Sequence, residues 1–199
     1  MANYQAVFAV GDSLTTFLQN SYNDDPSTAG FPWTCTFKLF SSPDMTAEDQ
    51  TNDGVVSLFL HRMTTDENFR QVTRLPSEPN ETPILFLDLH YLITYWGTSA
   101  EAEHTILTWT MQQLQSNSIL DSSILNLSTA NAGWDTTEAI QLMPADLSLD
   151  DILRIWEAFG PKYRLSISYL ARVVRIDRPI PPPGQPVVAT RFTLENALT

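Results

Sequence analysis

Apolar residues recur at steps of three and four positions in three parts of the chain, which is the spacing of an amphipathic helix. The first part spans residues 4–20. The second spans 98–116 and opens with Thr98 and Glu101, a pair that fits a capping box. The third spans 148–160, where a serine precedes two aspartates and a Gly-Pro pair follows the last apolar residue. Each pattern predicts a helix that buries one face.

Five other parts of the chain alternate between apolar and polar residues or form short apolar runs. Strands are predicted over residues 33–40, 55–63, 84–96, 138–143 and 163–176. The run at 84–96 is apolar on both faces, so we expect a central strand. In the last strand Val174 interrupts the polar face, so the burial of that face stays open. Residues 119–127 fit either a helix or a strand.

These elements predict one α+β domain over residues 1–178, in which a mixed or antiparallel β-sheet is packed by about three helices. Residues 179–199 form a separate arm. It begins with a proline-rich stretch that can be neither a helix nor an interior strand, because proline lacks the backbone N–H donor. Strand character then returns, with Val187, Val188, Thr190 and Phe192 as its pairing residues. We predict that they pair with the open sheet edge of a neighbouring copy; a return to the chain's own sheet stays open.

The chain is acidic, with a net charge of −12, which argues against general nucleic-acid binding. Its charge is unevenly distributed, because residues 1–153 carry 4 Lys/Arg and 20 Asp/Glu, whereas residues 154–199 carry 7 and 3. Such asymmetry favours an oriented contact with another copy or with an acidic neighbour. Arg164, Arg172 and Arg175 are the candidates for that contact. A solvated basic edge strand is the alternative interpretation.

Few features point to a cofactor, a metal or a membrane. The single cysteine, Cys35, cannot form an intrachain disulfide, and no Cys/His cluster indicates zinc. Asp88 and His90 can share one strand face, where a hydrogen-bonded core pair is favoured over a metal site. The sequence has no visible signal peptide and no run of about 20 apolar residues. We therefore expect no cofactor, no metal, no direct membrane insertion, and synthesis in the cytoplasm.

The tetrapeptide Gly11–Leu14 resembles the first block of the GDSL-type serine hydrolases, in which the serine is the nucleophile. That chemistry needs a base within hydrogen-bond reach of Ser13 and a third group that orients the base. The family supplies its base from an Asp-x-x-His motif near the C-terminus, but the last histidine here is His104 and no such motif exists. We therefore predict that Ser13 is a polar position inside a helix and that the chain has no catalytic residue. A GDSL-like esterase and a standalone protein-binding module remain the alternative functions.

Three segments occur in an order that is typical of one further family. They are residues 85–96, the helix around 102–107, and residues 149–159 running into 163–169. Together with the N-terminal helix and the strand at 55–62, they resemble the cap, or tube-terminator, family of extracellular contractile injection systems. These phage-tail-like particles are of the antifeeding-prophage and Photorhabdus virulence-cassette type.

The resemblance implies a tail-terminator-like α+β domain without a cofactor or catalytic residues. It implies a hexameric ring of this chain on the last layer of the inner tube, in contact with the last layer of sheath protein. The partners would then be further copies, the inner tube protein and the sheath protein, in a bacterial particle that is either released or membrane-anchored. Larger members carry additional C-terminal sequence, whereas here only the proline-rich spacer and a short strand follow Ile176.

Overall fold

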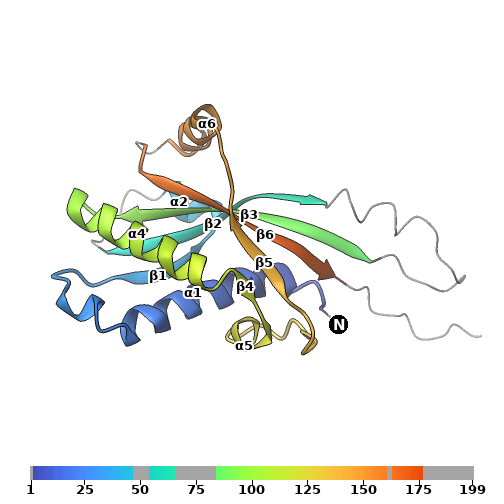
Figure 1. The fold of residues 1–199 in the computed structure, drawn as a ribbon. Coiled ribbons are helices and arrows are strands. Elements are labelled where there is room, and N and C mark those ends of the chain that lie inside the picture. The colour runs from blue at the N-terminus through green and yellow to red at the C-terminus, as the bar shows by residue number, and fades with distance from the viewer. Residues whose placement is uncertain (1, 47–53, 66–83, 161–162, 177–199) are drawn as a thin grey trace, which may run out of the picture.

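The computed structural model describes residues 2–46, 54–65, 84–160 and 163–176. Within them lies a sheet of six strands in the order β1-β2-β3-β6-β5-β4 (Figure 1). The strands are β1 (Thr36–Phe40), β2 (Val55–Thr65), β3 (Leu85–Trp96), β4 (Ile119–Leu120), β5 (Ile140–Pro144) and β6 (Ser166–Ile176). Among the described strand pairs, β1 with β2 is parallel and the others are antiparallel. The sheet is therefore mixed, which is one of the two arrangements predicted from the sequence.

Three longer helices accompany the sheet, and the predicted α+β class is confirmed. The helices are α1 (Ala6–Asp24), α4 (Ala100–Ser116) and α6 (Leu149–Phe159), with the short α2 (Ser42–Thr46), α5 (Ser122–Leu125) and 3-10 turn η1 (Thr28–Gly30) between them. The ambiguous stretch at 119–127 therefore holds a two-residue strand and one helical turn.

The helix ends follow from local capping, with one correction to the prediction. Ser99, and not Thr98, caps α4, because its hydroxyl accepts a hydrogen bond from the Ala102 N–H at 3.4 Å. For α6 the predicted cap holds: Ser148 Oγ accepts from the Asp151 N–H at 3.2 Å. Gly160 ends α6 with a φ of 81°, a left-handed conformation that costs glycine no Cβ clash.

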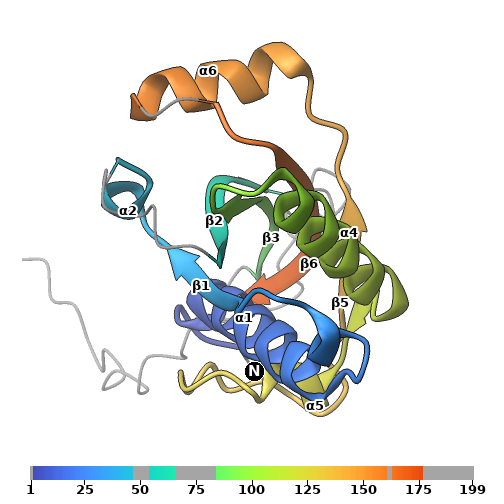
Figure 2. The ribbon, with the colours of Figure 1, turned by 90° about the vertical axis from the view of Figure 1, so that its left-hand side faces the viewer.

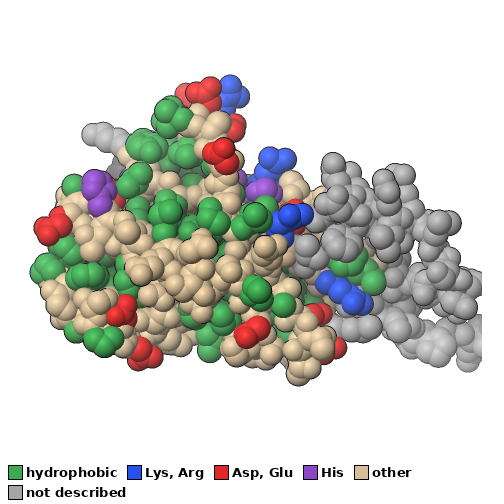
Figure 3. All heavy atoms as spheres, viewed as in Figure 1, with side chains coloured by type: hydrophobic (Ala, Val, Ile, Leu, Met, Phe, Trp, Pro, Cys, Tyr) green, Lys and Arg blue, Asp and Glu red, His purple; other side chains and the backbone are tan. Residues whose placement is uncertain are grey.

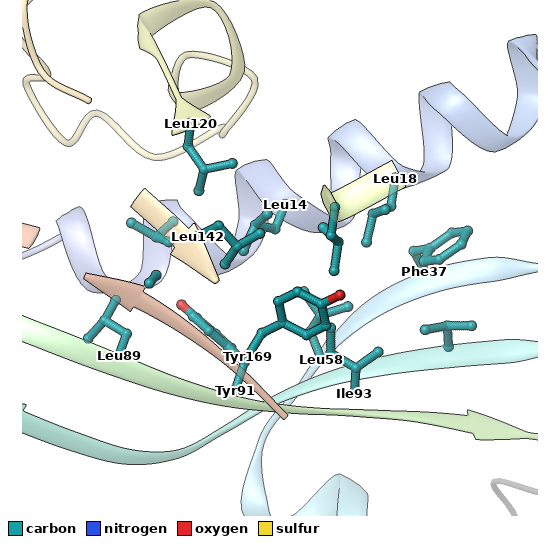
Figure 4. Packing of buried hydrophobic residues seen from close by; sticks show 14 of the residues in the cluster. Leu14, Leu18, Phe37, Leu58, Leu89, Tyr91, Ile93, Leu120, Leu142 and Tyr169 are labelled. Atoms are coloured by element: carbon teal, nitrogen blue, oxygen red, sulfur yellow. The ribbon is translucent and has the colours of Figure 1, made fainter. Parts of the chain in front are cut away.

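The main core lies between one face of the sheet and the helices α1 and α4 (Figure 2). In Figure 4, Leu14 and Leu18 of α1 lie above the strands that carry Tyr91 and Ile93. All four side chains are at most 2% exposed. Since truncating a buried leucine to alanine costs about 2–5 kcal/mol, Leu14 and Leu18 each contribute substantially to the stability of the domain.

A second, smaller core covers one end of the opposite sheet face. There α6 and α2 pack over the sheet through Trp156 and Met45, and the Phe159 ring lies 5.3 Å from the Phe59 ring. Trp96 lies in the middle of this cluster and its indole N–H donates to Ser57 Oγ at 2.8 Å. The rest of this sheet face is not covered by any described helix (Figures 1 and 2).

A bulge in β6 decides on which face of the strand Val174 lies, a point that the sequence left open. Leu89 pairs with Ala171, but Leu87 pairs with Val174, so β6 has one more residue than β3 between the two pairs. The extra residue moves Val174 to the core face, where it is fully buried. The position of Val174, which the sequence left open, is therefore on the core face, because a bulge shifts the two-residue period by one position.

Candidate assembly surfaces

The residues of the hydrolase-like tetrapeptide join α1 to the loop after α5. Ser13 is fully buried, and its hydroxyl donates to the Leu125 carbonyl at 2.8 Å. Asp12 accepts from Ser128 Oγ at 2.8 Å and from the Thr129 N–H at 2.9 Å. Ser13 therefore holds two helices together, in agreement with its predicted place inside a helix, and no described histidine is hydrogen-bonded to it.

Gly11 explains the remaining position of that tetrapeptide. A Cβ at this residue would lie 2.7 Å from Cδ1 of Leu39. The missing side chain therefore allows α1 to approach β1 closely, and Gly11 has a packing role and not a catalytic one.

One sheet face beyond α6 is basic and carries histidines. The basic face is defined here by His61, Arg62, His90, Arg172 and Arg175. The strand register places Arg62, His90, Arg172 and Arg175 opposite to the core face, and the Asp88 carboxylate lies on that face as well. His61 is the extra residue of a bulge in β2 between Leu60 and Arg62. Figure 3 shows Lys/Arg and His side chains grouped beyond the base of α6. In a chain of net charge −12, such a group is a candidate contact for an acidic protein surface.

The two histidines of the basic face are held neutral by their surroundings. Their ring centroids are 6.0 Å apart. Burial lowers the pKa of His61 to about 4, with further lowering from His90 and Arg62. The pKa of His90 is lowered by burial and by Arg62, while the Asp88 carboxylate acts in the opposite direction. The His90 ring also lies 3.1 Å from Thr64 Oγ1, so a threonine of β2 is a hydrogen-bond partner of His90, while its predicted pairing with Asp88 stays a prediction.

The predicted interface arginines are divided between two environments. Arg172 and Arg175 lie on the basic face, both partly buried. The guanidinium of Arg164 lies 5.0 Å from the centre of the Trp96 ring and donates to the Gly97 carbonyl at 3.2 Å. The structure therefore does not bring the three together, and Arg164 has a structural contact that sequence reasoning missed.

Helix α6 exposes part of the face that its pattern predicted to be buried. Trp156 is 2% exposed, whereas Leu149 and Leu153 are 64% and 44% exposed. Just after the helix, Tyr163 and Leu165 are 47% and 37% exposed. Apolar and acidic side chains lie together on this helix at the top of Figure 3. An amphipathic helix with an uncovered apolar edge is a candidate protein contact.

Other chemistry is limited in the described part of the chain. Burial raises the pKa of Cys35 to about 12, which makes its thiol unreactive. No group of three or more potential metal ligands occurs among the described residues. Among those residues we also find no helix with the length and apolarity needed to cross a membrane.

The comparison with known proteins identifies the family. The profile described as the Pvc16 N-terminal domain matches residues 9–190 of the chain. The chain belongs to the Pvc16 N-terminal domain family. The resemblance inferred from the sequence segments is thus confirmed, and the fold of this Pvc16 domain can be compared with solved relatives. No curated protein matches it.

The Pvc16 domain shares its fold with a solved tube terminator. The structure of the PVC sheath/tube terminator in the extended state, from an extracellular contractile injection system, matches with a TM-score of 0.52 and 18% identity. The alignment covers 96% of this chain and 64% of that one, so the chain spans less than two thirds of that terminator. The cap of the anti-feeding prophage matches with a TM-score of 0.46 and 17% identity, over 75% of this chain and 52% of that one.

The predicted strand-addition residues of the arm lie outside the described residues. They are Val187, Val188, Thr190 and Phe192. Their pairing, like the boundary between the domain and the arm at residue 178, stays a prediction.

Proposed function

We propose that this chain is the tube terminator, or cap, of an extracellular contractile injection system, and that its role is structural and not enzymatic. The observation that carries this proposal is the Pvc16 N-terminal domain match over residues 9–190, on a fold shared with the PVC sheath/tube terminator. The polar groups that suggested catalysis have structural partners instead, as Ser13 does in Leu125. A scaffold role needs contact surfaces, and the described residues carry two.

Six copies form a ring on the last layer of the inner tube. A closed ring requires two different, complementary patches on each subunit. The basic face supplies one patch, and the acidic first turns of α4 and α6 supply its complement, with Glu101 and Glu103 in α4 and Asp150 and Asp151 in α6. Opposite charges on the two sides orient each copy in the same sense around the ring.

The apolar edge of α6 makes the contact with a different protein. Leu149 and Leu153 are large and exposed, and the tryptophan that anchors the helix keeps them in a fixed position. Such a rigid apolar edge suits the inner tube protein or the last sheath layer, because preorganised contacts lose little conformational entropy on binding. The arm from residue 179 onwards adds a strand to a neighbouring sheet.

A tube-capping assay tests the function. Inner tube protein is polymerised with and without an equimolar amount of the full chain, and tube lengths and ends are examined by electron microscopy. We expect shorter tubes with extra density at one end. A Leu149→Arg and Leu153→Arg double variant should keep its fold, because both side chains are exposed, and should lose the capping effect. Tubes of unchanged length and bare ends with the unmodified chain would contradict the proposal.

A further inference from the structure

The outer edge of β1 has backbone groups that no described strand pairs. β1 is the first strand in the sheet order, and it bonds to β2 only on its inner side. The Thr36 N–H donates inwards to the Gly54 carbonyl at 2.8 Å. Backbone groups of successive residues in a strand point to opposite sides. Those of Phe37 and Leu39 therefore face outwards.

One side chain of α1 covers the first part of this edge. Gln19 Oε1 accepts a hydrogen bond from the Phe37 N–H at 3.0 Å, and Gln19 Nε2 donates to the Cys35 carbonyl at 3.4 Å. A glutamine amide has the same donor and acceptor as a peptide group, so it imitates one residue of an added strand. Beyond Gln19 the edge continues, and the outward-facing backbone N–H and C=O of Leu39 can pair with an added strand.

Two hollows adjoin this open part of the edge. They have volumes of about 470 and 520 Å³, and Phe8 of α1 and Leu39 of β1 line both of them. Phe8 is 53% exposed and Tyr4, in the first hollow, is 68% exposed. The first hollow is largely apolar, whereas the second is lined mainly by polar side chains of α1. A groove beside an unpaired strand edge is the arrangement that binds an extended peptide, because the backbone supplies hydrogen bonds and the groove takes alternate side chains.

The floor of the first hollow contains a buried polar atom without a partner. Tyr91 is 1% exposed, and its hydroxyl has no hydrogen-bond partner among the described residues. Figure 4 shows its ring directed from β3 towards α1. Buried hydroxyls are nearly always hydrogen-bonded, so this atom offers a hydrogen bond to a polar group that enters the hollow.

We propose that the groove beside β1 receives residues 187–194 of a neighbouring copy as an added strand. This inference rests on the ring proposed above and adds the receiving site. The segment has the required pattern, since Val188, Thr190 and Phe192 fall on one face. Its single charged residue is Arg191. The first hollow carries the carboxylate of Asp44 on its wall, and the second carries Asp12 together with Lys38, so the first hollow suits Arg191 better.

The direction of β6 favours a neighbour's groove over the chain's own. The register aligns Phe40, the last residue of β1, with Phe59, then Leu92, then Ser168. The described chain ends at Ile176, so it leaves the sheet about 25 Å past the end of β1, at about 3.3 Å for each strand residue. Residues 179–186 follow with five prolines, and such a stretch is a semi-rigid spacer. To return to its own β1, the chain would have to reverse direction within that spacer.

Disulfide formation between two tagged versions of the full chain tests this assignment in assembled particles. One version carries Phe8→Cys and the other carries Thr190→Cys or Phe192→Cys. The native Cys35 is buried and stays unreactive. We expect a disulfide that links the two tags, and none when Met111→Cys, a similarly exposed position on α4, replaces Phe8→Cys.

A second variant measures the contribution of the groove. Phe8→Arg places a charge in both hollows, and we expect at least a tenfold loss of the ring population with the thermal midpoint of the monomer unchanged. Met111→Arg is the matched control and should assemble normally. A disulfide within one copy, a link to a different protein of the particle, or rings that form without any link would overturn this inference and leave the proposed function intact. Absence of the chain from the tube ends would contradict both.

Discussion

The indole ring of Trp156 in α6 lies 5.9 Å from the indole ring of Trp96 at the end of β3. This contact, in a cluster that also holds Phe59, fixes the orientation of α6 over the second sheet face. It therefore also fixes the position of the exposed leucines that we assign to assembly. The same small core therefore stabilises α6 and holds its exposed leucines in place for a contact with another protein.

Removing the Trp156 side chain should destabilise the domain strongly. We expect Trp156→Ala to lower the free energy of unfolding by about 3–5 kcal/mol, because it empties a buried site of this size. Trp156→Phe should cost less, since the buried indole N–H has no hydrogen-bond partner among the described residues and its loss removes an unsatisfied donor. Urea unfolding followed by circular dichroism measures both. Leu149→Ala, at an exposed position, should stay within about 0.5 kcal/mol of the parent, and an equal cost for Leu149 and Trp156 would refute this view of α6.

Ser13→Ala separates a structural serine from a nucleophile. Because the variant removes the hydrogen bond to the Leu125 carbonyl in a fully buried place, we expect a loss of about 1–3 kcal/mol in the free energy of unfolding. Hydrolysis of a simple aryl ester should be at background in both parent and variant. Thr16→Ala, on the partly exposed side of the same helix, is the control and should have little effect. An ester-hydrolysis rate that is clear in the parent and absent in the variant would restore the hydrolase interpretation.

The arginines should differ in what they stabilise. Arg164→Ala removes the stacking on Trp96 and the hydrogen bond to Gly97, so we expect a loss of about 1 kcal/mol in the isolated domain. Arg172→Glu should instead weaken assembly at low ionic strength, since charged patches at an interface act mainly on encounter and orientation. Chemical unfolding and light scattering report the two effects separately. Normal rings from the Arg172→Glu variant would remove the basic face from the interface.

The domain should become less stable as the pH is lowered through the range in which His61 binds a proton. The pKa of this histidine is about 4 in the folded chain, below the ordinary value of about 6.5. The unfolded chain therefore binds more protons between these pH values, and the folded state loses stability as the pH falls from about 6.5 towards 4. One pKa unit corresponds to about 1.4 kcal/mol, and partial exposure of the ring reduces the effect to about 1–2 kcal/mol.

Thermal unfolding across that range provides the measurement for His61. The carboxylates of Asp25 and Asp44 have pKa values held below their ordinary value by hydrogen bonds, so they titrate below this window. The His61→Asn variant should show a flatter dependence of the thermal midpoint on pH. His104→Asn, at an exposed position on α4, should retain the parent profile. The same slope in the parent and in the His61 variant would assign the effect to other groups.

Much of the fold follows from local pattern. The helices α1, α4 and α6 were predictable because each repeats its apolar residues at the period of a helix. The long strand β3 was predictable as an apolar run on both faces, which is typical of a central strand. The helix ends were also close, since Ser148 and Gly160 have side-chain and backbone properties that suit a cap. Thr98 and Ser99 are adjacent and chemically equivalent as caps, so only the backbone conformation could choose between them.

The surfaces depend on tertiary structure that no local pattern contains. The bulge that buries Val174 arises from the match between β3 and β6, two strands distant in sequence. The contact of Arg164 with Trp96 joins residues that are 68 positions apart. The exposure of Leu149 was not predictable either, because an amphipathic pattern indicates an apolar face but does not indicate whether this chain or another protein covers it.

Cryo-electron microscopy of intact particles that contain this chain tests the central claim most directly. We expect six copies of the fold described here in a closed ring at one end of the inner tube, with the basic face of each copy against an acidic face of the next. A map in which both tube ends lack this fold, or in which single copies lie apart from the tube, would contradict the account.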